Sequence, residues 1–134
     1  MSHKIEELKH EITEIMDGIA SAWLKVDELR RLEENWDYYG AQPISETAII
    51  NLLRLMKLFP KLTKWQVSPG VNGDIYMNYK GENVLSGGII LLPNNKCICY
   101  AEGENEICRV GEFKFSPKQV KKMMIDMERG RLVK

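Results

Sequence analysis

Cysteine and histidine, the residues that most often bind metals or attack substrates, are few in this chain. The cysteines are Cys97, Cys99 and Cys108, and the histidines are His3 and His10. Cys97 and Cys99 would lie on one face of a strand, whereas metal sites usually place a turn between paired cysteines and add further ligands. We therefore predict buried free thiols, with no metal site and no cofactor.

Carboxylates are more numerous, and one group of them is dense enough for acid–base chemistry to be considered. Glu102, Glu104 and Glu106 lie close together in the sequence, and Asp74 starts another predicted strand. Two carboxylates that face each other are the arrangement that glycoside hydrolases use. Closely spaced acids are more simply a solvated hairpin loop, and no histidine is expected near a nucleophile. We predict no catalytic residue; a small enzyme using these sheet carboxylates is the alternative.

The charge balance argues against a broad interaction with nucleic acid. The chain has 134 residues, 44% of them apolar, with 19 basic and 19 acidic side chains and a net charge of zero. These values are typical of a globular protein, and we predict one domain over residues 1–134. Six basic residues and two acids lie in 116–134, a pattern typical of the solvated face of a terminal helix. A nucleic-acid accessory protein that uses this basic helix is a further, less favoured alternative.

The chain shows no sign of a membrane segment or of export. No apolar run reaches the roughly 18 residues of a membrane-spanning helix, and the charged residues near the N-terminus do not resemble a secretory signal. An odd number of cysteines is typical of a reducing compartment. We therefore expect a cytoplasmic protein without membrane contacts.

A helix is predicted over 3–34. Its apolar residues recur in alternating steps of three and four, which is the pattern of a coiled coil. This seam begins with Ile5, Leu8, Ile12 and Ile15. A straight helix over this range would be about 48 Å long, whereas a compact domain of this size is only about 36 Å across. Either the chain breaks at 17–18 and folds back or a second copy covers the seam; we expect a homodimer through this helix.

Helical and strand patterns divide the rest of the chain. A second helix is predicted from Ser45 to about Phe59, and a last one after Ser116, which serves as its N-cap. Five strands are predicted between them, at 65–68, 74–80, 84–92, 97–101 and 107–115. The expected fold class is α+β, with two N-terminal helices, a five-stranded antiparallel meander and a C-terminal helix, and with the helices packed on one face of the sheet.

Two short patterns inside these elements have more than one interpretation. Gly87 and Gly88, within the third predicted strand, indicate a bulge or a close approach of another backbone. Met123, Met124 and Met127 form the apolar stripe of the last helix, which favours packing on the sheet over a soft binding surface.

The segment between the first two helices, WDYYGAQPIS over 36–45, has a recognisable motif. It resembles the Trp-Asp-Gly-x-Gly-Ala-x-Pro motif of a group of small, uncharacterised bacterial and phage-associated proteins, with Tyr38 in place of the motif's first glycine. The resemblance covers about residues 30–80 and implies a prokaryotic or mobile-element origin. The family brings no established activity.

The turn chemistry of the same segment predicts a rigid corner. Trp36 is expected to be largely buried where the first helix meets the sheet. Asp37 is expected to accept backbone N–H bonds, and Gly40 to supply a positive φ. The residues that we assign to this structural motif are Trp36, Asp37, Gly40, Ala41, Pro43 and Ser45.

Two adjacent tyrosines, Tyr38 and Tyr39, are the candidate partner-binding residues. Two neighbouring side chains on an irregular turn do not easily both enter the core, so at least one of them should be exposed. Tyrosine combines an apolar body with a polar tip, which suits a binding anchor. We predict a non-enzymatic accessory protein that binds another protein, and the resemblance is compatible with an antitoxin-like or phage–host conflict role.

Overall fold

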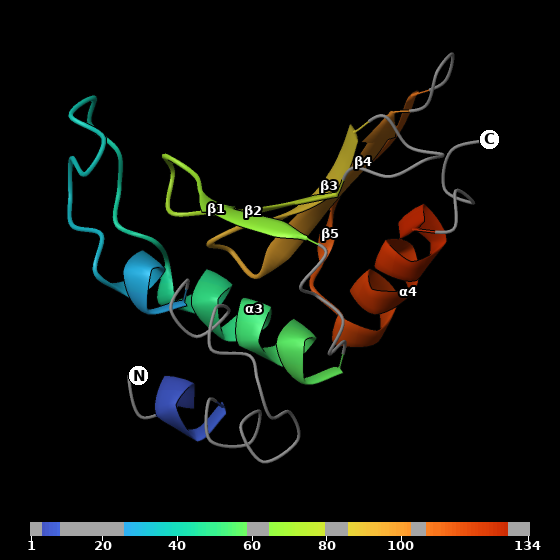
Figure 1. The fold of residues 1–134 in the computed structure, drawn as a ribbon, viewed down its shortest axis with the longest axis horizontal. Helices are drawn as coiled ribbons and strands as arrows, with labels where there is room; N and C mark the ends of the chain where they lie inside the picture. Colours follow the sequence, from blue (N-terminus) through green and yellow to red (C-terminus); the bar gives the residue numbers. More distant parts are fainter. Residues whose placement is uncertain (1–3, 9–25, 59–64, 80–85, 103–106, 129–134) are drawn as a thin grey trace.

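The computed structural model describes residues 4–8, 26–58, 65–79, 86–102 and 107–128 (Figure 1). Two short helical stretches, 4–8 and 26–30, precede the longer elements. These elements are α3 (Glu46–Leu58), β1 (Gln66–Pro69), β2 (Ile75–Tyr79), β3 (Ser86–Leu91), β4 (Lys96–Glu102), β5 (Ile107–Lys114) and α4 (Pro117–Glu128). The α+β class is confirmed.

The five strands form one antiparallel meander in the order β1-β2-β3-β4-β5. Each predicted strand overlaps an observed one, and the β1–β2 turn contains Gly73 at a φ of 82°, which glycine adopts freely. Pairing is continuous through Gly87 and Gly88, so the third strand has no bulge there. The register shift lies instead between Cys97 and Cys99, where β4 meets β5.

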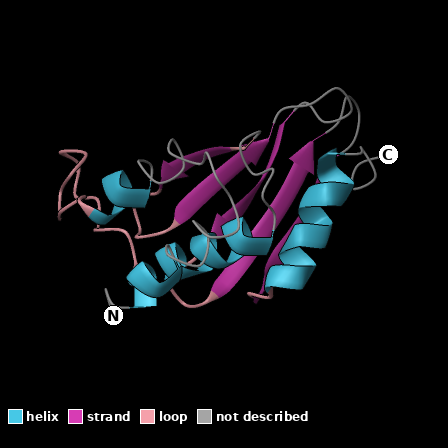
Figure 2. Ribbon diagram, turned by 60° about the horizontal axis from the view of Figure 1, so that its bottom comes forward, coloured by secondary structure: helices cyan, strands magenta, loops and turns pink. Residues whose placement is uncertain are grey.

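The sheet has a buried face and an outer face, because alternate side chains of a strand point to opposite sides. Helices α3 and α4 both lie on the buried face (Figures 1 and 2). The side chains buried there include Ile75, Met77, Ile89, Leu91, Cys97 and Cys99. Burial of each large apolar side chain stabilises the fold by roughly 1.5–3 kcal/mol relative to leaving it exposed.

Both long helices begin where the sequence predicts. Ser45 directly precedes α3, and the Oγ atom of Ser116 accepts a hydrogen bond from the backbone N–H of Gln119 at 3.5 Å, as an N-cap does. Met124 and Met127 are fully buried, and Met123 is partly buried against the core. The core-packing interpretation of the methionine stripe is therefore confirmed.

Of the two arrangements left open for residues 3–34, the structure has the chain folded back on itself. Nη1 of Arg30 lies 2.8 Å from Oε1 of Glu6, 24 positions earlier in the chain. In a straight helix these residues would be about 36 Å apart. The chain therefore doubles back between them, and Ile5 and Leu8 are buried in the core of the same chain.

This burial removes part of the argument for a homodimer. Ile5 and Leu8 were expected to need a second copy to cover them, and the single chain covers both. Ile12, Ile15 and the 17–18 break lie outside the described residues. Dimerisation itself stays a prediction. Within the described ranges, no helix combines the length and apolar character needed to span a membrane.

Candidate functional site

The corner, which we define as residues 35–45, begins with a small closed loop. The backbone N–H of Asn35 donates to the carbonyl oxygen of Ala41 at 2.7 Å, which joins the two ends of the loop. The Oδ1 atom of Asn35 accepts the N–H of Gly40 at 2.7 Å, and its carbonyl oxygen accepts the N–H of Tyr38 at 3.0 Å. Asn35 itself has a φ of 64°, a conformation that asparagine tolerates well.

Asp37 holds the inside of this loop, as the sequence predicts. Its Oδ1 atom accepts the backbone N–H of Tyr39 at 2.8 Å and that of Ala41 at 3.0 Å. Bonds to an ionised acceptor are stronger than bonds between neutral groups. A single carboxylate oxygen therefore fixes the backbone on both sides of Gly40, whose φ of 88° confirms the predicted positive value.

Backbone bonds attach the corner to the sheet. Gln42 donates its N–H to the carbonyl oxygen of Val71 at 2.8 Å, and Ser45 donates to Gly73 at 2.8 Å. Both acceptors belong to the β1–β2 turn, which Figure 1 shows beside the corner. Ala41 is buried, so the base of the loop is anchored in the protein while its tip is free.

Trp36, which the sequence predicts to be largely buried, is partly buried and is not among the hydrophobic residues of the core. Nε1–H donates to the carbonyl oxygen of Gln42 at 2.8 Å. The indole thus bridges the loop from its first residues to its last, because its polar edge finds a partner at the surface that the core does not provide.

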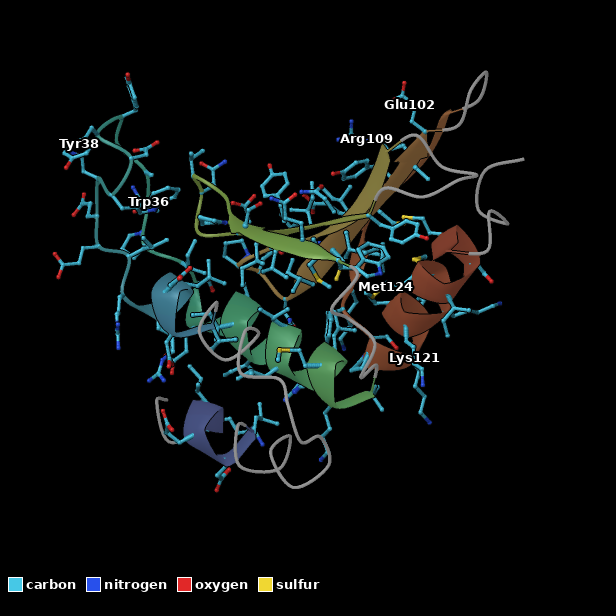
Figure 3. All side chains as sticks on the ribbon, in the orientation of Figure 1. Trp36, Tyr38, Glu102, Arg109, Lys121 and Met124 are labelled. Carbon is cyan, nitrogen blue, oxygen red and sulfur yellow. The ribbon has the colours of Figure 1, made fainter. Side chains whose placement is uncertain are left out.

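The two tyrosines stand out at the tip of the loop. Tyr38 is 88% exposed and Tyr39 is 94% exposed, and Figure 3 shows Tyr38 at the outer edge of the molecule. Tyr38 also has a φ of 65°, in the left-handed region. That conformation costs roughly 1–2 kcal/mol for a residue with a Cβ atom, and it is the one that glycine adopts freely.

The carboxylates considered for catalysis do not come together. Asp74 precedes β2 beside the end of β3 at Leu91, whereas Glu102 pairs with Ser86 at the other end of β3. Five residues of antiparallel strand separate these ends by about 17 Å. Asp74 is buried, and its Oδ1 atom accepts the N–H of Asn72 at 3.3 Å, which is a structural role in the turn. Glu104, Glu106, His3 and His10 lie outside the described residues.

Cys97 and Cys99 have the buried character that was predicted. Cys97 and Cys99 are free thiols on the buried face of β4. Burial, with a smaller effect from Cys99, raises the pKa of the Cys97 thiol to about 12, so that it is not a thiolate at neutral pH. Cys108 lies opposite Ala101 in β5. In the part of the chain that the structure describes, no cluster of three potential metal ligands occurs.

Sequence reasoning missed two contributors to the corner. Asn35 closes the loop with its backbone and its amide oxygen, and an asparagine just before a turn motif is a signal that could have indicated this. Val71, which is 53% exposed on the adjoining turn, gave no signal, because only the folded chain brings it to the corner.

Comparisons with models of known protein families, with curated proteins and with solved structures gave no match for this chain.

Proposed function

We propose that the protein binds another protein through the corner, with Tyr38 and Tyr39 as the anchoring side chains. The observation that carries this proposal is the exposure of both tyrosines, 88% and 94%, on a loop whose backbone is fixed by hydrogen bonds. Aromatic side chains on rigid backbone are the residues that most often dominate the binding energy of protein interfaces.

The rigidity of the loop matters for affinity. A flexible loop loses conformational freedom when a partner orders it, and each immobilised side chain adds to that cost. In the corner, Asn35 and Asp37 already hold the backbone that carries the tyrosines. Tyrosine has only two side-chain torsions, so covering it costs little entropy and buries roughly 150–250 Å².

The conformation of Tyr38 adds a second argument. A non-glycine residue in the left-handed region is strained, and such strain is concentrated at functional sites. Its φ of 65° is maintained on a side chain that makes almost no contact with its own protein. Packing within the fold therefore does not account for a tyrosine at this position, whereas contact with a partner does.

The surroundings of the corner indicate the character of the partner. No lysine or arginine occurs from 32 to 53, and the acids in this stretch are Glu33, Glu34, Asp37 and Glu46. Exposed Val71 adds an apolar side chain next to the loop. A complementary partner surface would combine an apolar pocket with basic residues, and its binding would weaken at high salt.

The test is recovery of the partner from the native host with the tagged protein. The variant Tyr38→Ser with Tyr39→Ser should lose the partner, while Tyr38→Phe with Tyr39→Phe should retain most of it because the rings remain. Leu58→Ser, which removes an exposed apolar side chain at the end of α3, is the control. If the double serine variant is folded and retains its partner as tightly as the parent, the corner is not the binding surface.

A further inference from the structure

The outer face of the sheet, which points away from α3 and α4, carries a second candidate surface. In the described part of the chain, no element packs over this face (Figures 1 and 2). The strand register places the following residues on it: Gln66 and Ser68 of β1, Tyr76 and Asn78 of β2, Gly88 and Ile90 of β3, and Ile98 and Tyr100 of β4. The face therefore combines two aromatic rings with polar amides.

Tyr100 lies along the sheet surface. Its hydroxyl donates to Oδ1 of Asn78 at 2.5 Å, and the two residues are on strands that flank β3. Both are directly opposite Gly88 in the register, so the tyrosine side chain crosses over this glycine. A side chain that spans a neighbouring strand in this way must lie across the sheet, with one ring face toward the backbone and the other away from it.

Gly88 makes this arrangement possible. A methyl group at this position would lie 2.5 Å from the carbonyl oxygen of Met77 and 2.8 Å from the hydroxyl of Tyr100. Any larger residue would displace the ring. The close approach that the glycine pair predicts is therefore present at Gly88, and its result is a tyrosine ring resting on bare backbone.

Tyr76 lies on the same face. A methyl group at Gly70 would lie 1.9 Å from Oδ1 of Asp74 and 2.6 Å from Cε1 of Tyr76, so Asp74 and the edge of this ring both approach a glycine. Tyr76 is two residues along β2 from Asn78, a separation of about 7 Å. Burial raises the pKa of Tyr100, and Tyr76 and Cys99 add to the shift, so the Tyr100 hydroxyl stays protonated and donates its bond.

Basic side chains lie on the same face. Lys96 and Lys114 pair directly across β4 and β5, and Arg109 is directly opposite Tyr100. All three are exposed, and no ion pair joins any of them to a carboxylate among the described residues. Like charges directly opposite each other destabilise a sheet, so the lysine pair lowers the stability of the fold when no anion is bound beside it.

We propose that the outer face of the sheet binds single-stranded nucleic acid. Bases would stack on the rings of Tyr76 and Tyr100, and phosphates would contact Lys96, Arg109 and Lys114. A sheet with aromatic rings and flanking cations is a common platform for unpaired bases. Glu102 and Glu112 reduce the charge of these two strands to +1, so stacking must supply most of the affinity, and duplexes should bind more weakly.

Fluorescence anisotropy with labelled oligo(dT) and oligo(rU) of about 12 nucleotides tests this, since single-strand sites span about 4–16 nucleotides. The full chain should bind at least one of them more tightly than a duplex of equal length. Tyr100→Leu should weaken binding about 5- to 100-fold through loss of stacking, whereas Tyr100→Phe, which retains the ring, should stay close to the parent.

Charge variants locate the site without disturbing the fold. Arg109→Gln should weaken binding and reduce its salt dependence, whereas Lys122→Gln, the same change on an exposed residue of α4, should have no effect. Absence of binding by the parent at 100 µM would overturn the proposal. So would equal binding by the parent and Arg109→Gln, or a loss confined to Lys122→Gln, which would place the site on the helix.

Discussion

Tyr38 has a backbone conformation that is costly to the fold. Its left-handed φ favours glycine, its ring makes little contact with the rest of the chain, and the loop around it is tied by Asn35 and Asp37. Stability alone would favour a smaller residue at this position. The strain is confined to the corner. Substitutions there should therefore distinguish the residues that stabilise the fold from the residues that bind a partner.

Tyr38→Gly is expected to leave the free energy of unfolding unchanged or to raise it by up to about 1 kcal/mol, because relief of backbone strain offsets the entropy that glycine gains when unfolded. Tyr39→Gly is the matched control. Tyr39 is equally exposed but is not among the positive-φ residues, so glycine there should lower stability by about 0.5–1 kcal/mol. Urea unfolding of both variants measures this; equal losses would contradict the strain argument.

Asp37→Ala removes the acceptor of two backbone N–H groups at the tip of the corner. We expect it to lower the free energy of unfolding by about 1 kcal/mol, since water can partly replace an exposed acceptor. The larger effect should be on the partner, because the tyrosines would no longer be held in place. Thermal unfolding and the pull-down measure the two effects separately. A variant that loses stability but binds normally would show that loop order is not needed for binding.

Cys97 should make stability fall at alkaline pH. Its folded pKa, raised to about 12 by burial, lies above the ordinary pKa of 9.0 that the thiol has when unfolded. The unfolded state therefore ionises first, so the stabilising contribution is complete below pH 9 and is lost as the pH rises toward 12. Cys97→Ala should show a flatter decline than the parent over this range, measured by urea unfolding at several pH values. Parallel curves would refute the assignment.

At the scale of elements, the sequence predicts the sheet well because its signals are local. Alternating apolar residues define each strand, and turn residues such as Asn72-Gly73 separate them. The α3 and α4 boundaries follow from Ser45 and Ser116 for the same reason. The sequence leaves the arrangement of residues 3–34 open, because steps of three and four occur equally in one long helix and in two short ones that fold back. Only a contact distant in sequence, Glu6 with Arg30, distinguishes them.

At the corner, too, features that depend on neighbouring residues were predictable, and features that depend on contacts distant in sequence were not. Asp37 and Gly40 behave as turn chemistry predicts, because their roles depend on a few neighbouring residues. The partial exposure of Trp36 was not predictable, since it depends on where the completed loop lies relative to the core. The outer-face surface was missed because Tyr76 and Tyr100 are 24 positions apart and come to the same face, with β3 between their strands, only through the strand register.

Spin labels at Glu6→Cys and Arg30→Cys test the folded-back arrangement. We expect a distance below about 20 Å, compared with about 36 Å for a straight helix. The native cysteines are Cys97, Cys99 and Cys108, of which Cys97 and Cys99 are buried, and their labelling is checked in the parent protein. Dilution with unlabelled protein excludes a distance between two copies. A value near that of the straight helix would show that the chain does not fold back between these two positions.

On the scale of the whole molecule, the helical layer and the two candidate surfaces lie in different parts of the fold. Helices α3 and α4 cover one face of the sheet and supply most of the buried apolar side chains outside it. The corner is attached to the β1–β2 turn, and the outer face of the sheet lies on the side away from the helices. Substitutions on one surface should therefore leave the other unchanged.

The position of the N-terminal segment decides how its apolar residues contribute to stability. Ile5 and Leu8 are buried with Val26 and Leu29 in the same chain. Ile5→Ala should then lower the free energy of unfolding by about 2 kcal/mol, the low end for a buried isoleucine, because the segment is near the chain terminus.

If the chain itself provides this burial, the loss will be the same at every protein concentration. If a second copy provided it, unfolding would be linked to dissociation and the melting temperature would rise with concentration. Thermal unfolding of the parent and of Ile5→Ala across a hundredfold range of concentration separates the two cases. A concentration-dependent melting temperature that Ile5→Ala abolishes would restore the homodimer and contradict burial within one chain.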